Sequence, residues 1–277
     1  MSYRDFLLAP IEAPGSPERS AVESRRFGLS VGRLHVSPRA RYGVEALVEA
    51  IDSSDFDVVI LRYPAERIEW FGALARGRRR PLFADSVHVL QLPLPSQTGP
   101  DPEAAGARFE RVDHESFPSF VRALGPAFKD HTPHYAANPW LPSVPAEEVY
   151  EGWMRALLDV PDARVVMTRL GDDPEPVGFF AIETYELDGR RGEYHIIGTL
   201  PGLRRGHVGT LSADEGHRQL HAMGCDASLC LVRVSNVASL NLVLSLGYRP
   251  ILTVNTLHLI HPRLLERRGR AGAATPA

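Results

Sequence analysis

Residues Gly192–Gly224, GEYHIIGTLPGLRRGHVGTLSADEGHRQLHAMG, predict a strand, a glycine-bearing basic turn and a helix, in that order. We expect the strand over Glu193–Leu200, because Pro201 lacks a backbone donor and stops a strand. The helix is expected to end at Gly224, since glycine commonly follows the last helical residue. Free N–H groups at the start of a helix attract anions, and the turn adds two arginines, so a phosphate or pyrophosphate site is predicted here. The alternative is an ordinary strand-to-helix turn with solvated arginines.

The composition is that of an ordinary globular protein. The chain has 277 residues, of which 44% are hydrophobic and 23% charged, enough for one large domain or two small ones. A net charge of −3 without a dominant basic block argues against nucleic acid as a partner. The cysteines, Cys225 and Cys230, suggest neither a disulfide framework nor a zinc cluster. The apolar run in the opening residues MSYRDFLLAP is too short for a secretion signal. The sequence also has no apolar stretch long enough to span a bilayer. We therefore expect a cytoplasmic protein without a membrane partner.

The first part of the chain alternates between strands and helices. The residues up to 25 are rich in Pro, Ser and Glu and are expected at the surface. Hydrophobic periodicity then predicts strands at Gly28–Val36, Asp57–Arg62 and Ser86–Leu92, and helices at Tyr42–Asp52 and Ala65–Arg76. The stretch Pro93–Glu103 contains four prolines and a glycine, and it is interpreted as a linker. We therefore predict one domain over residues 1–103, a second over 104–265, and a flexible tail over 266–277.

The second part begins with an aromatic-rich segment and continues with strands. Helices are expected around Phe117–Phe128 and at Glu147–Leu158 and Val237–Leu246, and strands at Arg164–Arg169, Val177–Leu187, Ala227–Val234 and Tyr248–Ile260. Between the first two helices lie His131, His134 and Tyr135, which we assign to packing or substrate contact rather than to a metal, because no acidic or cysteine cluster accompanies them. The stretch from Leu244 faintly repeats the stretch from Leu74, which suggests that the first part is a reduced version of the second.

Two sequence features, correctly spaced, resemble the GNAT acyltransferase superfamily. The first is the turn Arg204-x-x-His207-x-Gly209, in which His207 occupies the position of the family's middle glycine. The second is Asn236 after a strand, followed about ten residues later by Leu246–Gly247–Tyr248. The resemblance implies a mixed α/β fold, with a central mixed sheet in the C-terminal half and a smaller, reduced GNAT-like N-terminal half.

This resemblance also implies a function. Acetyl-CoA would be the co-substrate and a small primary amine the acceptor, in an N-acetyltransferase that could form a homodimer. More of the chain is similar to fucosamine-type acetyltransferases, which implies a nucleotide-linked amino sugar as one such amine. A non-catalytic acyl-CoA-binding or scaffold protein is the alternative. The residues that would contact coenzyme A are Thr199, Leu200, Arg204, Arg205, Gly206, His207, Val208, Gly209, Thr210, Asn236 and Ser239.

The acceptor amine must lose a proton, so the strand before the turn was searched for a base. Glu193 is the preferred candidate, His195 is the rival because its unperturbed pKa suits neutral pH, and Glu183 is a weaker third. Gly198 is expected to mark a bulge or a close approach of the backbone. Val243 stands where many relatives carry a tyrosine that protonates the leaving thiolate, which leaves room for the non-catalytic alternative.

Overall fold

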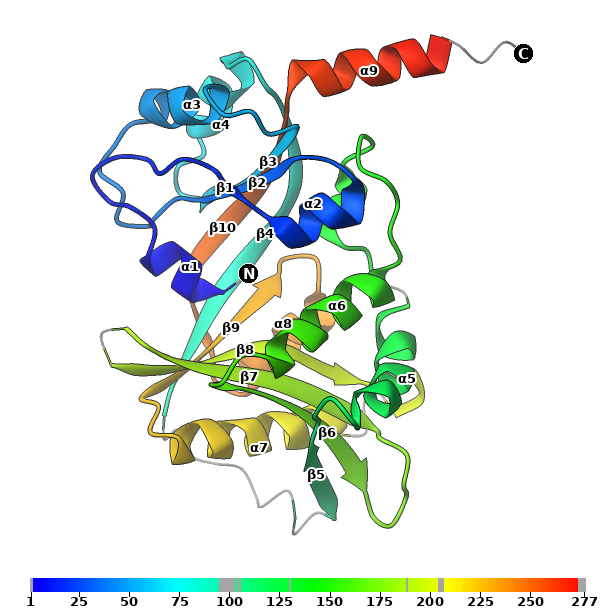
Figure 1. Ribbon diagram of the computed structural model, residues 1–277. Coiled ribbons are helices and arrows are strands. Elements are labelled where there is room, and N and C mark those ends of the chain that lie inside the picture. Colours follow the sequence, from blue (N-terminus) through cyan, green and yellow to red (C-terminus); the bar gives the residue numbers. More distant parts are fainter. Residues whose placement is uncertain are drawn as a thin grey trace.

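In the computed structural model, residues 2–94, 103, 106–129, 131–187, 189–203 and 207–273 are described, and their strands form a single mixed sheet. The order across this 10-stranded sheet is β1-β2-β3-β10-β4-β9-β8-β7-β6-β5 (Figure 1). The strands are β1 Glu18–Arg19, β2 Val31–His35, β3 Val58–Pro64, β4 Arg80–Pro93, β5 Ala107–Arg111, β6 Ala163–Leu170, β7 Gly178–Glu186, β8 Arg190–Thr199, β9 Ala227–Arg233 and β10 Arg249–Ile260.

The helices cover both faces of this sheet. They are α1 Tyr3–Leu7, α2 Ala21–Phe27, α3 Val44–Asp52, α4 Trp70–Arg76, α5 Phe117–Phe128, α6 Ala146–Leu158, α7 Val208–Ala222, α8 Val237–Ser245 and α9 Pro262–Ala273, with short 3-10 turns η1 at His134–Ala137 and η2 at Pro201–Leu203. The prediction of a mixed α/β fold with a large mixed sheet is confirmed.

In the N-terminal half, β3 is the most buried strand. All of its residues are buried, as expected for a continuous apolar run inside a sheet. Its side chains alternate between two cores: Val59 and Leu61 pack with α3 and α4, whereas Val58 and Ile60 pack with α2 and the η1 segment. Arg62 also lies on this second face, where it is buried and lines one wall of the candidate site.

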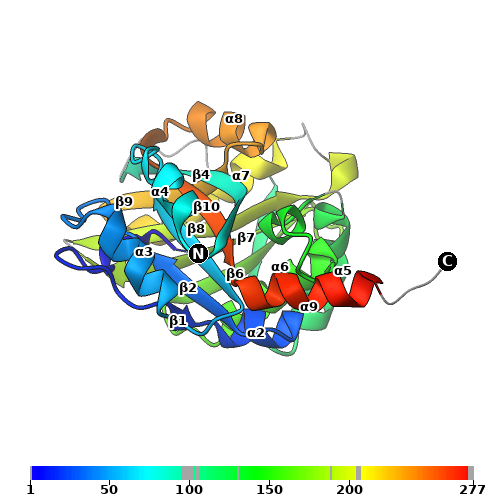
Figure 2. The ribbon, with the colours of Figure 1, turned by 90° about the horizontal axis from the view of Figure 1, so that it is seen from above.

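In the C-terminal half, the two faces of the sheet have separate helical covers. Helices α5 and α6 pack on one face of β6 and β7, through residues such as Phe120 and Phe179. Helix α7 packs on the opposite face, where Leu220 contacts the core around Phe180 and Tyr194. Figure 1 shows α7 below the sheet, away from α5 and α6, and Figure 2 gives the arrangement from above.

The final strand joins the two halves. Strand β10 lies between β3 and β4 and is antiparallel to both, and β4 pairs with β9 on its other side. The two predicted domains thus contribute to one sheet, and the boundary between residues 103 and 104 stays a prediction. Most of the predicted linker Pro93–Glu103 lies outside the described residues.

The N-terminal segment is more buried than the sequence predicted. The first 25 residues were expected at the surface, yet Phe6 is fully buried and Glu23 is 0% exposed because Arg33 and Tyr135 bond to its carboxylate. At the other end, α9 runs up to Ala273 and extends from the sheet in Figure 1, and the flexibility of residues 266–277 stays a prediction. Among the residues described, no helix has the length and apolar content needed to cross a membrane.

Candidate active site

The candidate site lies where two parallel strands separate. The ladder between β8 and β9 runs from Arg191–Ala227 to Tyr194–Cys230 and ends there. Beyond this point the two strands enclose a cavity of about 480 Å³, lined by Ile196 and Ile197 of β8 and by Val232 of β9. Strand residues in a broken ladder keep backbone N–H groups that are free to bind a ligand, because no neighbouring strand uses them.

A β-bulge in β8 lies at the same place, and it changes the direction in which the following side chains point. The register of β7 against β8 shifts between Ala181 and Ile182, so that Tyr194 and Ile196 are paired but His195 is the extra residue. The prediction of a bulge at Gly198 was wrong, because the irregularity falls at His195. The predicted close approach at Gly198 is confirmed, since a Cβ built there would lie 2.3 Å from Cζ of Phe179.

His195 is held by a carboxylate and lines the cavity. Its Nε2–H donates to Oε2 of Glu183 at 2.7 Å, and this hydrogen bond, the largest influence, lowers the pKa of Glu183. The ring of Trp153 packs edge-on against the imidazole with centroids 5.7 Å apart. The other nitrogen, Nδ1, is buried and has no hydrogen-bond partner among the described residues. With Nε2 protonated, Nδ1 is the acceptor end of a neutral imidazole.

Glu193, the preferred base from the sequence, is buried elsewhere. It is 0% exposed, and its Oε2 accepts hydrogen bonds from Ser2 Oγ at 2.7 Å, Tyr3 N at 3.0 Å and Tyr185 OH at 3.1 Å. Burial raises the pKa of its carboxyl group. Glu193 is not among the residues that line the cavity. The structure therefore brings His195 and Glu183 together in the candidate site and places Glu193 against the N-terminal segment.

Only part of the predicted pyrophosphate turn can be placed. Arg204, Arg205 and Gly206 lie outside the described residues. His207 precedes α7 with φ of 59°, and among the described residues it is the non-glycine residue with a positive φ. This backbone conformation is the one that glycine adopts without strain, which accounts for the glycine at this position in the family signature.

The other turn residues lie at the edge of the cavity, not in its wall. Thr199 ends β8, Leu200 follows it, and Val208, Gly209 and Thr210 form the first turn of α7. A Cβ at Gly209 would lie 3.3 Å from Leu242, which does line the cavity. The N–H groups of this first helical turn are free for an anion.

Helix α8 provides another wall. Asn236 caps it, because its Oδ1 accepts from the N–H of Ser239 at 3.1 Å, and both residues line the cavity. Val243 also lines it. Tyr248, which the sequence placed in a motif but not in the site, also lines the cavity. Its OH lies 2.8 Å from His217 Nε2 and 2.5 Å from Ser228 Oγ. Burial lowers the pKa of His217 to about 4.

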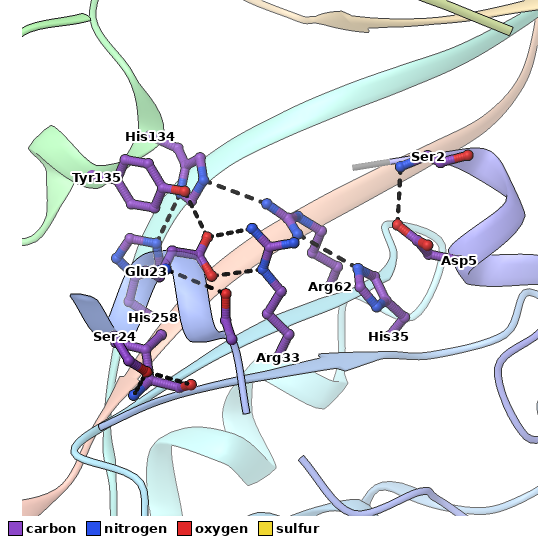
Figure 3. A network of polar contacts seen from close by, with 12 residues as sticks. Ser2, Asp5, Glu23, Ser24, Arg33, His35, Arg62, His134, Tyr135 and His258 are labelled. Carbon is purple, nitrogen blue, oxygen red and sulfur yellow. Dashed lines mark hydrogen bonds and ion pairs between the residues drawn. The ribbon is translucent and has the colours of Figure 1, made fainter. Parts of the chain in front are cut away.

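The N-terminal half supplies a polar wall that sequence reasoning missed. Arg33 and Glu23 form a bidentate ion pair with distances of 2.6 Å, and Tyr135 OH donates to the same carboxylate at 2.6 Å. Beside them, the guanidinium of Arg62 lies between the rings of His35 and His134 (Figure 3). Substrate contact was one of two roles predicted for residues around His134. No pattern in β3 itself distinguished Arg62, since a lone arginine in an apolar strand has no characteristic spacing.

The architecture and the cavity define a mixed α/β protein with a ligand-sized opening between two central parallel strands. Residues 126–248 match the model of a family described as the acetyltransferase (GNAT) family. The match covers less than half of the chain, and it shows that this part of the chain is similar to GNAT acetyltransferases. The sequence matches no curated protein.

Solved structures resemble the whole chain at low identity. A conserved protein of unknown function from Staphylococcus epidermidis is 9% identical, with a TM-score of 0.56 and coverage of 94% of this chain and 98% of that one. A GCN5-related N-acetyltransferase from Sphaerobacter thermophilus is 15% identical, with a TM-score of 0.56 over 86% of this chain and 75% of the other. A tandem GNAT protein from the clavulanic acid pathway is 13% identical, with a TM-score of 0.54 and coverage of 83% and 75%. At these identities the likeness shows the fold alone.

Proposed function

We propose that this protein transfers the acetyl group of acetyl-CoA to a small primary amine. The observation that carries the proposal is the cavity at the point where β8 and β9 separate, with the start of α7 beside it and α8 in its wall. A cleft of this kind can hold an extended thioester between two strands, because the unpaired edge of each strand offers backbone hydrogen bonds. The family match over the same residues supports this function.

Coenzyme A would lie with its pyrophosphate at the turn before α7 and its pantetheine arm along α8. The supports are the left-handed backbone at His207 and the free N–H groups of the first turn of α7. Asn236 keeps its side-chain amide N–H₂ for a ligand, because the cap uses only Oδ1. Backbone N–H groups of β8 beyond Tyr194 would stabilise the negative charge that develops on the thioester oxygen.

We propose His195 as the proton acceptor and Glu183 as its positioning residue. A simple alkyl amine has a pKa of about 10 and is mostly protonated near neutral pH, so a base assists the attack. As the new N–C bond forms and the C–S bond breaks, the electron pair leaves with sulfur and the amine proton moves to Nδ1 of His195. Glu183 stabilises the resulting imidazolium through the 2.7 Å hydrogen bond. Glu193, in contrast, is proposed to anchor the N-terminal segment.

The next question is which amine accepts the acetyl group. A nucleotide-linked amino sugar remains one proposed amine, because the aromatic segment resembles that of fucosamine-type acetyltransferases. The cavity volume of about 480 Å³ limits the size of the acceptor that can bind together with coenzyme A. Charged groups in the N-terminal wall provide a stronger criterion for the class of acceptor.

The test compares two glutamine variants, with thiol release from acetyl-CoA measured over a panel of amines. His195→Gln should lower turnover about a hundredfold to ten-thousandfold near neutral pH, with partial recovery as pH rises and free amine becomes abundant. Glu193→Gln should keep most of the turnover but lose stability, because the buried carboxylate anchors Ser2, Tyr3 and Tyr185. Coenzyme A affinity, measured by calorimetry, should be unchanged in His195→Gln.

Two outcomes would change this assignment. If Glu193→Gln loses turnover steeply and His195→Gln does not, Glu193 is the base and not an anchor of the N-terminal segment. If acetyl-CoA binds but no amine in a broad panel releases thiol, the protein is a non-catalytic acyl-CoA-binding protein. Both variants bind coenzyme A in the proposed scheme, so affinity alone does not decide between these outcomes.

A further inference from the structure

Three buried polar side chains on one row of the sheet each keep an atom without a hydrogen-bond partner in the described part of the chain. They are Nε of Arg62 on β3, Oγ1 of Thr256 on β10 and Oδ1 of Asp85 on β4. Thr256 is directly paired with Arg62 on one side and with Asp85 on the other, and directly paired residues point to the same face. Their exposed fractions are 4%, 0% and 9%, so bulk water does not satisfy them.

A second buried arginine shows how unusual Arg62 is. Arg79 is 3% exposed and also has no carboxylate partner among the described residues, but backbone carbonyls accept from all of its side-chain nitrogens at 2.6–3.2 Å. Among the residues that the structure describes, the side chain of Arg62 donates only to His35 at 3.5 Å and to His134 at 3.4 Å, as Figure 3 shows. A buried cation needs good acceptors to offset its lost hydration. Arg62 therefore has donor capacity that the folded chain does not use.

Asp85 provides the complementary charge. Its Oδ2 lies 3.4 Å from Nε of Arg233, while Oδ1 keeps its lone pairs free. Both Arg62 and Asp85 line the cavity. Arg33, which also lines the cavity, is occupied by its bidentate pair with Glu23. Arg26 and Arg233 line it as well, but Arg62 and Asp85 are the buried cation and the buried anion of this wall. They are separated by a single strand, or about 10 Å between their backbones.

We propose that Arg62 and Asp85, with Thr256 between them, bind the head group of an α-amino acid, so that the acceptor is an amino acid with a second amine on its side chain. The inference rests on the proposed acetyl transfer and names its substrate class. Arg62 would bind the α-carboxylate and Asp85 the α-ammonium. A simple anion would be attracted by Arg62 but repelled by Asp85, whereas a zwitterion with both charges on one carbon is complementary to both.

The position of the row determines which amine reacts. Strands β9 and β8 follow β4 in the sheet, and the register places Tyr194 level with Cys230 of β9 and Leu90 of β4. His195 therefore lies two strand spacings across and about four residues along the strands from Asp85, or about 16 Å between backbones. The α-ammonium held by Asp85 is therefore not the nucleophile. The side-chain amine reaches toward His195 along a wall of rings in which Tyr150 and Trp153 are 6.2 Å apart, and Trp153 and His195 are 5.7 Å apart. This amine forms the N–C bond, coenzyme A leaves as the thiol, and the amine proton passes to His195.

The experiment measures thiol release from acetyl-CoA with four acceptors. L-lysine and L-ornithine carry the whole head group, pentane-1,5-diamine lacks the carboxylate of lysine, and 6-aminohexanoate lacks its α-amine. The two diamino acids should have a kcat/KM at least tenfold above both truncated amines, with acetylation at the side-chain nitrogen by tandem mass spectrometry. Arg62→Met should remove the preference over pentane-1,5-diamine, and Asp85→Asn the preference over 6-aminohexanoate. Equal kcat/KM for all four acceptors would overturn the inference while leaving acetyl transfer intact.

Further measurements separate a binding role from a structural one. Arg79→Met removes another buried arginine and should lower stability without changing the order of the acceptors. Arg62→Lys keeps the charge and should retain part of the preference if Arg62→Met fails to fold. If no amine is acetylated, calorimetry with saturating coenzyme A decides: binding of L-lysine that is lost in the Arg62 variants supports the site, and absence of binding of both diamino acids overturns it.

Discussion

A single methyl group added at Gly216 should destabilise this protein, although alanine favours helices. Gly216 lies in α7 and faces Tyr194 of β8, and a Cβ built there would lie 1.9 Å from the tyrosine hydroxyl oxygen and 2.6 Å from Cζ. The hydroxyl donates to the carbonyl of Ala213 at 2.6 Å in a buried position. Gly216→Ala therefore displaces the ring and removes this hydrogen bond.

The magnitudes determine the sign. Replacing a helical glycine by alanine gains about 1 kcal/mol. Overpacking costs about 1–3 kcal/mol, and a buried hydroxyl group that loses its acceptor costs a further 1–3 kcal/mol or so. The net loss is about 3 kcal/mol from these ranges. Gly152→Ala in α6 is the matched control, because its Cβ would meet only the flexible end of Arg26 at 3.5 Å, and it should gain about 1 kcal/mol.

Chemical denaturation of the two variants provides the assay, with Tyr194→Phe as a third. Removing the hydroxyl relieves the closest contact, so Gly216→Ala should cost less in the Tyr194→Phe background than in the wild type, a coupling that a double-mutant cycle measures. The contact with Cζ remains, so the rescue is partial. Tyr194 also lines the cavity, and weaker coenzyme A binding should accompany the stability loss. A Gly216→Ala variant as stable as the wild type would refute the reasoning.

Two other predictions concern stability. Burial raises the pKa of Glu23, but the ion pair with Arg33 outweighs this effect, and the pKa is lowered from 4.5 to about 2. A carboxyl group with a lowered pKa stabilises the folded state above pH 4.5. This stabilisation is lost as the pH falls through 2. Denaturation should show Glu23→Gln about 3 kcal/mol less stable than wild type at pH 7, with the gap shrinking in acid; a gap independent of pH contradicts the prediction. At His207, where φ is 59°, the glycine variant should exceed the alanine variant in stability by about 1 kcal/mol; equal midpoints would show that the left-handed backbone is not strained.

The sequence predicted the local features of the candidate site best. The helix cap at Asn236, the close approach at Gly198 and the order of strands and helices around the turn depend on neighbouring residues, which the sequence contains. Glu193 was preferred over His195 for its position along the strand, and strict strand alternation would place both side chains on the same face. The bulge at His195 breaks that alternation, and neither residue's own neighbours in the sequence indicate which one is extra.

The row of polar residues Arg62, Thr256 and Asp85 could not be predicted, because it depends on how three strands pair in the sheet. Arg62 and Asp85 belong to strands that are neighbours in the sequence but are separated in the sheet by β10. Thr256 faces both only because β10 enters the sheet between them. No local pattern in the sequence predicts that a strand from the end of the chain lies between two strands from its beginning. Three polar residues with no motif thus become a site through long-range pairing.

The insertion of β10 also explains how two halves can serve one reaction. Strand β10 is antiparallel to both neighbours, and β4 continues the sheet to β9, whose separation from β8 opens the cavity. The wall proposed to hold the acceptor and the cleft proposed to hold coenzyme A therefore share one sheet, to which the strands of Arg62, Asp85 and His195 all belong. Such a framework fixes the spacing between head group and reacting amine, and that spacing selects the length of the acceptor.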